Sequence, residues 1–244
     1  MTAESPLYLG HPAWAEAFPW LVQGTTTRGD PDDPFDLGLF GDRFPSGGVM
    51  RHWDALLSMT AMSRVVHARQ LHGSHVRLHG AGPPGLDVVG ECDGHLTGER
   101  GVLLTVATAD CVPVFVVDAR RKVVGAVHAG WRGAAAGVLE MAMSVLEREV
   151  GSVMADVHVH LGPAICGTCY EVGPEVFEAL GQAVPEASTP IDLRAVLAER
   201  AIREGVPSGQ VSVSRHCTRC TDSGLFSHRG GDRQRQVGFI GIRR

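Results

Sequence analysis

The sequence predicts an α/β protein that folds as one domain spanning residues 1–244. Short apolar runs typical of strands alternate with longer segments of helical periodicity, which is the pattern of α/β and α+β chains. Hydrophobic residues make up 44% of the chain and charged residues 20%, so the chain can bury a substantial core. Its 244 residues would also accommodate two small domains, but no linker, internal repeat or low-complexity segment divides them.

The expected elements follow from the spacing of apolar residues. Two strands are expected within 63–80, on either side of a turn at 71–73, and two more within 101–118, broken at 109–111. A hairpin turning at 119–122 leads into a strand over 123–127. Further strands are expected within 157–163, 210–220 and 236–244, and helices over 133–150, 174–184 and 192–206.

Residues 24–48 are rich in Gly, Pro and Asp and lack apolar periodicity. The segment is therefore expected to be a long loop, and long loops in compact domains are often functional.

Charge and composition exclude several classes of protein. A net charge of −5 and a pI near 6.2 give no general attraction to polyanions, and the arginines cluster only near the C-terminus, so no nucleic-acid partner is expected. The N-terminal residues lack a basic and then apolar leader, and no apolar run approaches the ~20 residues that span a bilayer. We expect a soluble, cytoplasmic protein without a membrane partner. The sequence leaves its oligomeric state open.

Three possible metal ligands each stand at the end of a predicted strand. His72 lies in a tight turn after one strand, Cys111 follows the next, and His128 closes the strand of 123–127. In a reducing compartment, cysteines are buried thiols, metal ligands or nucleophiles. Two imidazoles and one thiolate leave a fourth position open, which is the composition of a catalytic zinc site. Alternatively, Cys111 is the nucleophile of a cysteine hydrolase with His128 as its base.

The segment after His128 suggests an anion site. Gly130 and Gly133 bracket Trp131 and Arg132 just before a predicted helix, and free N–H groups at a helix start beside a guanidinium favour anions. A helix cap with a surface arginine is the simpler alternative. Asp110, between two apolar strands, would be costly if it stayed unpaired.

Five motifs in order carry a resemblance to a known family: QLHG with His72, TADCVPV with Cys111, HAGWRG with His128, GPAICGTCYEVG from Gly162, and FSHRGGD from Phe226. From about Thr25 to the C-terminus, the chain resembles the multicopper polyphenol oxidoreductase, or laccase-domain, family, also described as a purine nucleoside phosphorylase family. The resemblance implies a layered sandwich with mixed β-sheets flanked by helices. It also implies a metal bound by the residues matching His72, Cys111 and His128.

The resemblance implies two activities. One is oxidation of polyphenols with copper, which needs several coppers and many histidines, whereas this chain has one His-x-His pair, His158 and His160. The other is zinc-dependent purine nucleoside chemistry, in which phosphate cleaves adenosine, inosine or methylthioadenosine and adenosine can be deaminated. The second fits better, because Arg132, with Arg28 from the long loop, could hold phosphate. A non-enzymatic nucleoside-binding protein is a further alternative.

Other residues match family positions. Asp93 could orient a ligand or shuttle a proton, Gln70 could face the pocket, and Glu171, His228 and Arg229 could contact substrate. The long loop departs from the family pattern in having Asp36 before Leu37, which affects substrate choice and the role of Arg28.

Two C-x₂-C pairs, Cys166 with Cys169 and Cys217 with Cys220, are a further metal-binding pattern, with His216 as an extra candidate ligand. Their separation exceeds the ~15 to 20 residues of compact zinc ribbons, and the family resemblance accounts for much of both segments. We therefore expect them not to form a closed Cys₄ site. Cys92 is expected to be buried.

Overall fold

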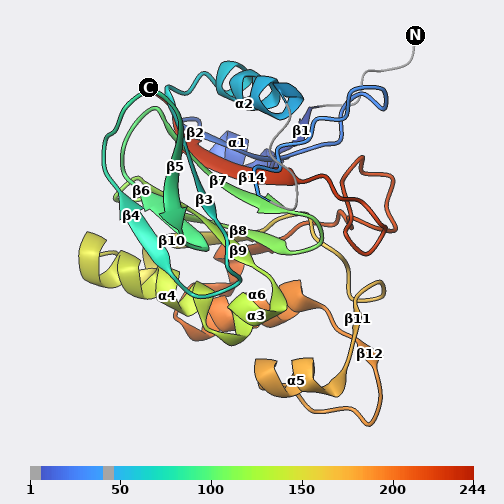
Figure 1. Cartoon of the computed structure of the whole chain (residues 1–244). Coiled ribbons are helices and arrows are strands. Elements are labelled where there is room, and N and C mark those ends of the chain that lie inside the picture. The colour runs from blue at the N-terminus through green and yellow to red at the C-terminus, as the bar shows by residue number, and fades with distance from the viewer. Residues whose placement is uncertain (1–6, 41–46) are drawn as a thin grey trace.

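The computed structural model describes residues 7–40 and 47–244, and it contains two stacked six-stranded sheets with helices on both outer faces (Figure 1). Both sheets are mixed, so the predicted layered α/β sandwich is confirmed.

In order across the first sheet, the strands are β1 (Tyr8–Leu9), β2 (Leu21–Thr26), β14 (Gln236–Ile242), β7 (Val102–Thr108), β3 (Arg64–Arg69) and β5 (Gly85–Glu91). In the second they are β13 (Val211–Val213), β10 (Val157–Leu161), β8 (Val112–Asp118), β9 (Val123–Ala129), β6 (Gly94–Thr97) and β4 (Val76–His79). A small sheet pairs β11 (Glu171–Val172) with β12 (Thr189–Pro190). The α-helices of the described ranges are α1 (Pro12–Ala17), α2 (Gly47–Thr60), α3 (Trp131–Ala135), α4 (Val138–Val145), α5 (Pro174–Leu180) and α6 (Leu193–Arg203).

Three apolar layers hold the sandwich together, one between the sheets and one under the helices on each side. Alternation along single strands places successive side chains in different layers. Leu103 of β7 faces α2, whereas Leu104 faces the second sheet. Likewise Phe115 of β8 lies between the sheets, and Val114 and Val116 pack toward α4 and α6. The near-continuous apolar runs of β7 and β8 therefore reflect strands that are covered on both faces.

Three sequence expectations need correction. The loop predicted from residue 24 begins only at 27, because β2 continues through Thr26; its residues 41–46 lie outside the described part. The helix predicted over 133–150 is divided: Gly137, at φ +80°, separates α3 from α4, and the last turn, Leu146–Val150, is a π-helix. The strand predicted within 210–220 is limited to β13, because the chain then turns through the cysteine-containing segment.

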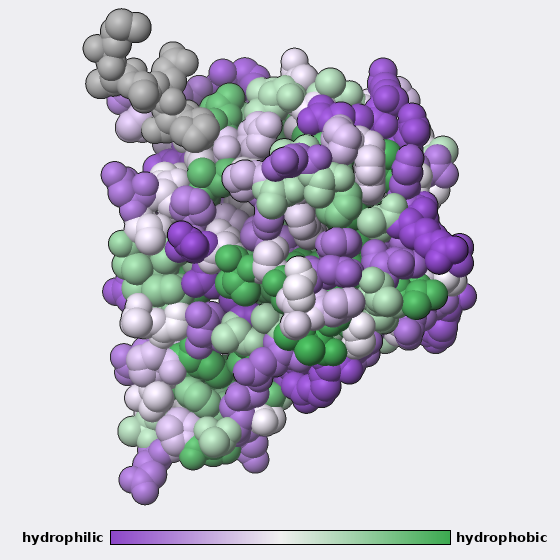
Figure 2. Space-filling model, turned by 180° about the vertical axis from the view of Figure 1, so that it is seen from behind, coloured by the Kyte–Doolittle hydropathy of each residue, from purple (hydrophilic) through white to green (hydrophobic). Residues whose placement is uncertain are grey.

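None of the helices in the described ranges has the length and apolarity that a membrane crossing requires. On the face turned away in Figure 1, apolar residues stand in small groups among hydrophilic ones (Figure 2).

Candidate metal centre and cavity

The predicted metal ligands come from one end of the two sheets. β3 and β7 run parallel, so their carboxyl ends, which lead into the turns of His72 and Cys111, share an edge. β8 begins where β9 ends, with Val112 opposite Ala129, so Cys111 and His128 face the same region. Strand direction and register therefore bring these three positions together, although they are far apart in the sequence.

The structure places a ligand atom of His72, Cys111 and His128 within 4.8 Å of one another. The two imidazole rings lie 4.8 Å apart at 78°. His128 is buried, Cys111 is half-buried and His72 is exposed, so the group opens toward solvent on the side of His72. The predicted convergence of these side chains is present, and the donor set fits zinc.

Asp93 fixes the side chain of His128 and the backbone turn that carries His72. Its carboxylate, 1% exposed, lies 3.0 Å from Nδ1 of His128 and accepts hydrogen bonds from the backbone N–H groups of Leu71, His72 and Gly73 at 3.2, 2.9 and 2.8 Å. Occupation of Nδ1 leaves Nε2 of His128 for a metal, the arrangement of a carboxylate–histidine–zinc triad. His72 has a φ of +58°, and the same carboxylate stabilises its turn. In this structure, the contacts of Asp93 are those of a residue that positions its neighbours.

Charge within the site shifts three pKa values. Burial opposes ionisation of Cys111, but His128 and hydrogen bonds with both histidines outweigh it and lower the thiol pKa to about 6. Burial likewise opposes protonation of His128, but Cys111 and Asp93 raise its pKa to about 9. Desolvation would also raise the pKa of Asp93, yet His128 and the backbone N–H donors hold it below its ordinary value. Without a metal, the site therefore favours a thiolate beside an imidazolium.

Gly130 leaves the space that this group requires. A Cβ at residue 130 would lie 2.9 Å from Sγ of Cys111 and 3.1 Å from Cδ2 of His72. A side chain there would force Sγ of Cys111 to move, because real Cβ atoms essentially never show contacts under 3.0 Å, and it would press closely on the His72 ring. Gly130, two residues after His128, therefore allows the backbone to pack closely against Cys111 and His72.

The three side chains line a cavity of about 350 Å³, within the range of small-molecule sites. Gln70 and His228, both named from the sequence, also line it. The Gln70 amide donates to the carbonyl of Ala107 and accepts from its N–H, so both of its polar atoms hold β7. The cavity is also lined by Phe40, His67, Thr108 and Arg235, which no local motif in the sequence marks.

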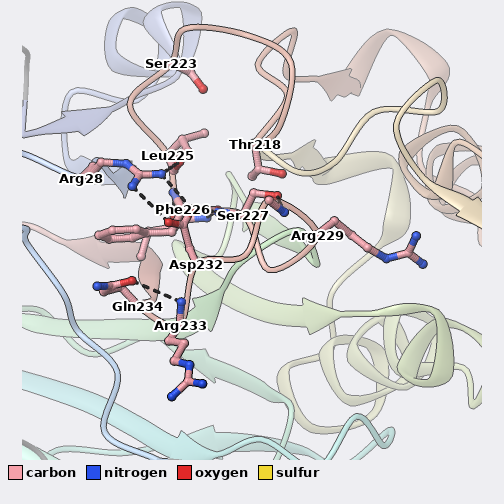
Figure 3. Close-up of polar contacts among 12 residues, drawn as sticks. Arg28, Thr218, Ser223, Leu225, Phe226, Ser227, Arg229, Asp232, Arg233 and Gln234 are labelled. Atoms are coloured by element: carbon pink, nitrogen blue, oxygen red, sulfur yellow. Dashed lines mark hydrogen bonds and ion pairs between the residues drawn. The ribbon is translucent and has the colours of Figure 1, made fainter.

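Arg28 does not line this cavity. Its guanidinium forms a bidentate ion pair with the Asp232 carboxylate at 3.2 and 2.8 Å (Figure 3). It also donates to the carbonyl of Leu225 and lies over the Phe226 ring. It thus ties the start of the long loop to the 225–232 turn. The structure gives Arg28 internal partners in place of the substrate that the sequence suggested.

Arg132 and Arg229 stand at the surface beside the site. The Arg132 guanidinium stacks over the Trp131 ring at 4.2 Å, and within the described ranges it forms no ion pair. Arg229 lies over the Tyr170 ring and donates to the carbonyl of Glu171, whose own side chain is exposed. Within the described ranges neither guanidinium has an anionic partner, and Arg132 differs in having only the ring contact, without a hydrogen bond to a backbone carbonyl.

The two C-x₂-C pairs meet, contrary to the expectation from their separation. The sulfur atoms of Cys166, Cys169, Cys217 and Cys220 all lie within 4.8 Å of one another. The parallel pairing of β10 with β13 brings the following turns side by side, so sequence distance does not keep them apart. Cys92 is buried, as predicted.

The His158 and His160 pair belongs to neither group. His160 lies 2.9 Å from the Ser212 hydroxyl through Nδ1 and packs against His11. In the described part of the chain, the groups able to hold a metal are the His72–Cys111–His128 site and the four cysteines.

Fold and site together define a layered α/β protein in which two histidines and a cysteine, placed as metal ligands would be, line a cavity. The chain belongs to the multi-copper polyphenol oxidoreductase laccase family, whose model matches residues 45–243, so the resemblance seen in the motifs is confirmed.

Named relatives point to nucleoside chemistry. The chain is 32% identical to purine nucleoside phosphorylase YlmD of Geobacillus stearothermophilus, over 94% of this chain and 93% of the relative. The crystal structure of YlmD from that organism superposes with a TM-score of 0.90 at 28% identity, covering 100% of this chain and 98% of that one. Adenosine deaminase RL5, from an unknown prokaryotic organism, is 35% identical over 56% of each chain.

Proposed function

We propose that this chain is a zinc-dependent purine nucleoside phosphorylase for adenosine, inosine and methylthioadenosine, with a side activity as adenosine deaminase. The observation that carries the proposal is the grouping of His72, Cys111 and His128 in the wall of a cavity of small-molecule size. The names of the relatives support the class of substrate.

Phosphorolysis needs a held anion and a stabilised leaving purine. An oxygen of phosphate bonds to C1′ of the ribose while the glycosidic bond breaks, and the purine leaves with the electron pair and takes up a proton. We assign phosphate to Arg132, because its guanidinium stacks on the Trp131 ring and has no anionic partner among the described residues. We assign closure over the nucleoside to His228, which lines the cavity, and to its neighbour Arg229.

Deamination places a different demand on the same cavity. A zinc ion bound by His72, Cys111 and His128 would supply a Lewis acid that lowers the pKa of water. The chain's own contribution is a rigid set of donors: Asp93 orients His128 and the His72 turn, and Gly130 leaves room for the ligands. Arg132 has no role in this reaction, since phosphate takes no part in it.

Arg132→Ala is therefore expected to separate the two activities. Loss of a charge-assisted hydrogen bond to phosphate should lower phosphorolysis by about 1.5 to 3 kcal/mol, or roughly 10- to 150-fold in kcat/KM for phosphate. Deamination of adenosine should change far less. The measurement is product analysis from adenosine, scoring adenine plus ribose 1-phosphate against inosine, with Arg203→Ala on the exposed side of α6 as the matched control. Unchanged phosphorolysis in Arg132→Ala would refute this assignment.

Asp93→Asn tests how far positioning matters. The substitution keeps the shape of the side chain but removes the charge that accepts from three N–H groups and His128. We expect zinc affinity to fall by about 10- to 100-fold, as it does when other carboxylates that hydrogen-bond to a histidine ligand are replaced. Competition against a chromophoric chelator measures the zinc affinity. The control is Asp87→Asn, which removes a carboxylate of β5 that pairs with Arg64 of β3. Equal affinity in wild type and Asp93→Asn would rule out the positioning role.

A cysteine hydrolase is the second candidate, favoured by one observation. Cys111, His128 and Asp93 form a connected series in which the thiol pKa is lowered and the carboxylate orients the base. The two candidates differ in their response to chelation. Zinc removal and return should abolish and restore a metal-dependent activity, whereas a thiol-dependent hydrolase should be active in the metal-free protein.

A further inference from the structure

The four cysteine sulfurs are spaced as in a tetrahedral thiolate complex. Zinc–sulfur bonds of about 2.3 Å in tetrahedral geometry place the sulfurs about 3.8 Å apart. Here Sγ of Cys166 lies 3.6 Å from Sγ of Cys220, and all four sulfurs lie within 4.8 Å of one another. A disulfide requires about 2.05 Å, and all four cysteines are free. The group has the dimensions of a metal site and contains no disulfide.

Backbone donors converge on one of these sulfurs. Sγ of Cys217, which is 1% exposed, accepts hydrogen bonds from the N–H groups of Cys166, Arg219 and Cys220 at 3.3, 3.3 and 3.5 Å. Backbone donors that converge on one sulfur are contacts of the kind that orient a metal ligand. Four thiolates this close would repel one another, so a bound cation is what would allow all four sulfurs to be ionised together.

The two cysteine turns are joined by the backbone independently of any metal. Ala164 pairs with Cys217 in a parallel bridge, and the N–H of Thr218 donates to the carbonyl of Ala164 at 3.2 Å. The buried Arg194 of α6 donates to the carbonyls of Ser214 and His216 at 2.9 and 3.0 Å, which fixes the entry to the second turn. The four ligands are thus held in place from both sides before a metal binds.

We propose that Cys166, Cys169, Cys217 and Cys220 form a second metal site, which binds zinc and is structural. Four protein sulfurs fill a tetrahedral shell and leave no position for substrate, unlike the open set of His72, Cys111 and His128. The ion would lock the turn after β10 to the turn after β13. Since Thr218 lies between two of the ligands and donates to Asp110, this lock also supports the residue before Cys111. The proposal is independent of the reaction assigned to the cavity.

Metal stoichiometry in variants tests the proposal. Protein purified with a phosphine reductant and without chelator is analysed for zinc by plasma mass spectrometry. We expect the double variant Cys169→Ser/Cys220→Ser, which removes one ligand from each pair, to hold one zinc fewer per chain than wild type. Combining it with His128→Ala should remove all zinc. Cobalt-substituted protein should show the visible bands of a tetrahedral thiolate complex, and the double variant should lack them.

Matched variants distinguish loss of a zinc ligand from misfolding of the protein. Cys220→His keeps a ligand at an exposed position and should retain the zinc, and Asp222→Ala, an exposed neighbour, should behave as wild type. The double variant should unfold at a lower temperature than wild type, and added zinc should not restore the wild-type melting temperature. Equal zinc content in wild type and the double variant would overturn the proposal. So would a wild-type protein whose zinc is all lost on His128→Ala alone.

Discussion

His128→Ala is expected to lose the metal of the cavity and, with it, both cleavage and deamination of adenosine. The substitution leaves His72 and Cys111 as the remaining ligands and removes the imidazole that Asp93 orients. Replacing a residue that hydrogen-bonds to a metal ligand already reduces metal affinity or activity by about 10- to 100-fold. Loss of the ligand itself should therefore lower activity by more than about 100-fold. Zinc content and product analysis from adenosine, with and without phosphate, measure the two effects.

The control for this result is His75→Ala. His75 is an exposed histidine three residues from His72, and its ring contacts only the carbonyl of Glu91 among described residues. It should retain full zinc content and activity. Thermal unfolding of both variants shows whether the fold is kept. Full activity in His128→Ala would contradict the proposed site, whatever the metal content.

Asp110→Ala is expected to give the largest loss of stability outside the apolar core. Asp110 is 7% exposed, and its carboxylate accepts hydrogen bonds from the Thr218 hydroxyl and from the N–H of Arg229 at 2.5 and 2.7 Å. Its φ of +87° lies in a region that Asp tolerates better than Ala. Hydrogen bonds to a charged group contribute about 1.5 to 3 kcal/mol each, so we expect a loss of about 3 kcal/mol.

Urea unfolding of wild type and three variants separates these contributions. Asp110→Asn keeps one acceptor oxygen and a side chain that tolerates positive φ, so it should lose less free energy of unfolding than Asp110→Ala. The exposed Asp222→Ala should match wild type. If Asp110→Ala were as stable as wild type, the carboxylate would not be the link between the Cys111 turn and the segments carrying Thr218 and Arg229.

Local patterns in the sequence predicted the parts of the site that occupy strand ends. His72, Cys111 and His128 each follow an apolar run, so strand prediction alone placed them at comparable positions, and parallel strands then brought them to one edge. The pairing expected for Asp110 was also predictable, because a carboxylate between apolar strands must find donors. Its particular partners, Thr218 and the backbone of Arg229, come from a distant segment and had no local signal.

Where the structure departs from the sequence expectations, the cause is long-range pairing or backbone conformation. The separation of the C-x₂-C pairs argued against a joint site, yet β10 and β13 are neighbours and bring them together. Arg28 carried a suitable charge for phosphate, but Asp232 lies opposite it in the folded chain. The helix break at Gly137 arises from a positive φ, which a smooth apolar period conceals.

The position of the cavity metal ligands at the seam between the two sheets bears on the order of folding events. His72 follows a strand of the first sheet, His128 lies in a strand of the second, and Cys111 occupies the turn between them. A complete ligand set can therefore exist only after the sheets have docked, so we expect metal coordination to come late in folding, after the transition state. A contact absent from the transition state slows unfolding without accelerating folding. Zinc in the cavity should accordingly lengthen the lifetime of the native state and leave the refolding rate nearly unchanged.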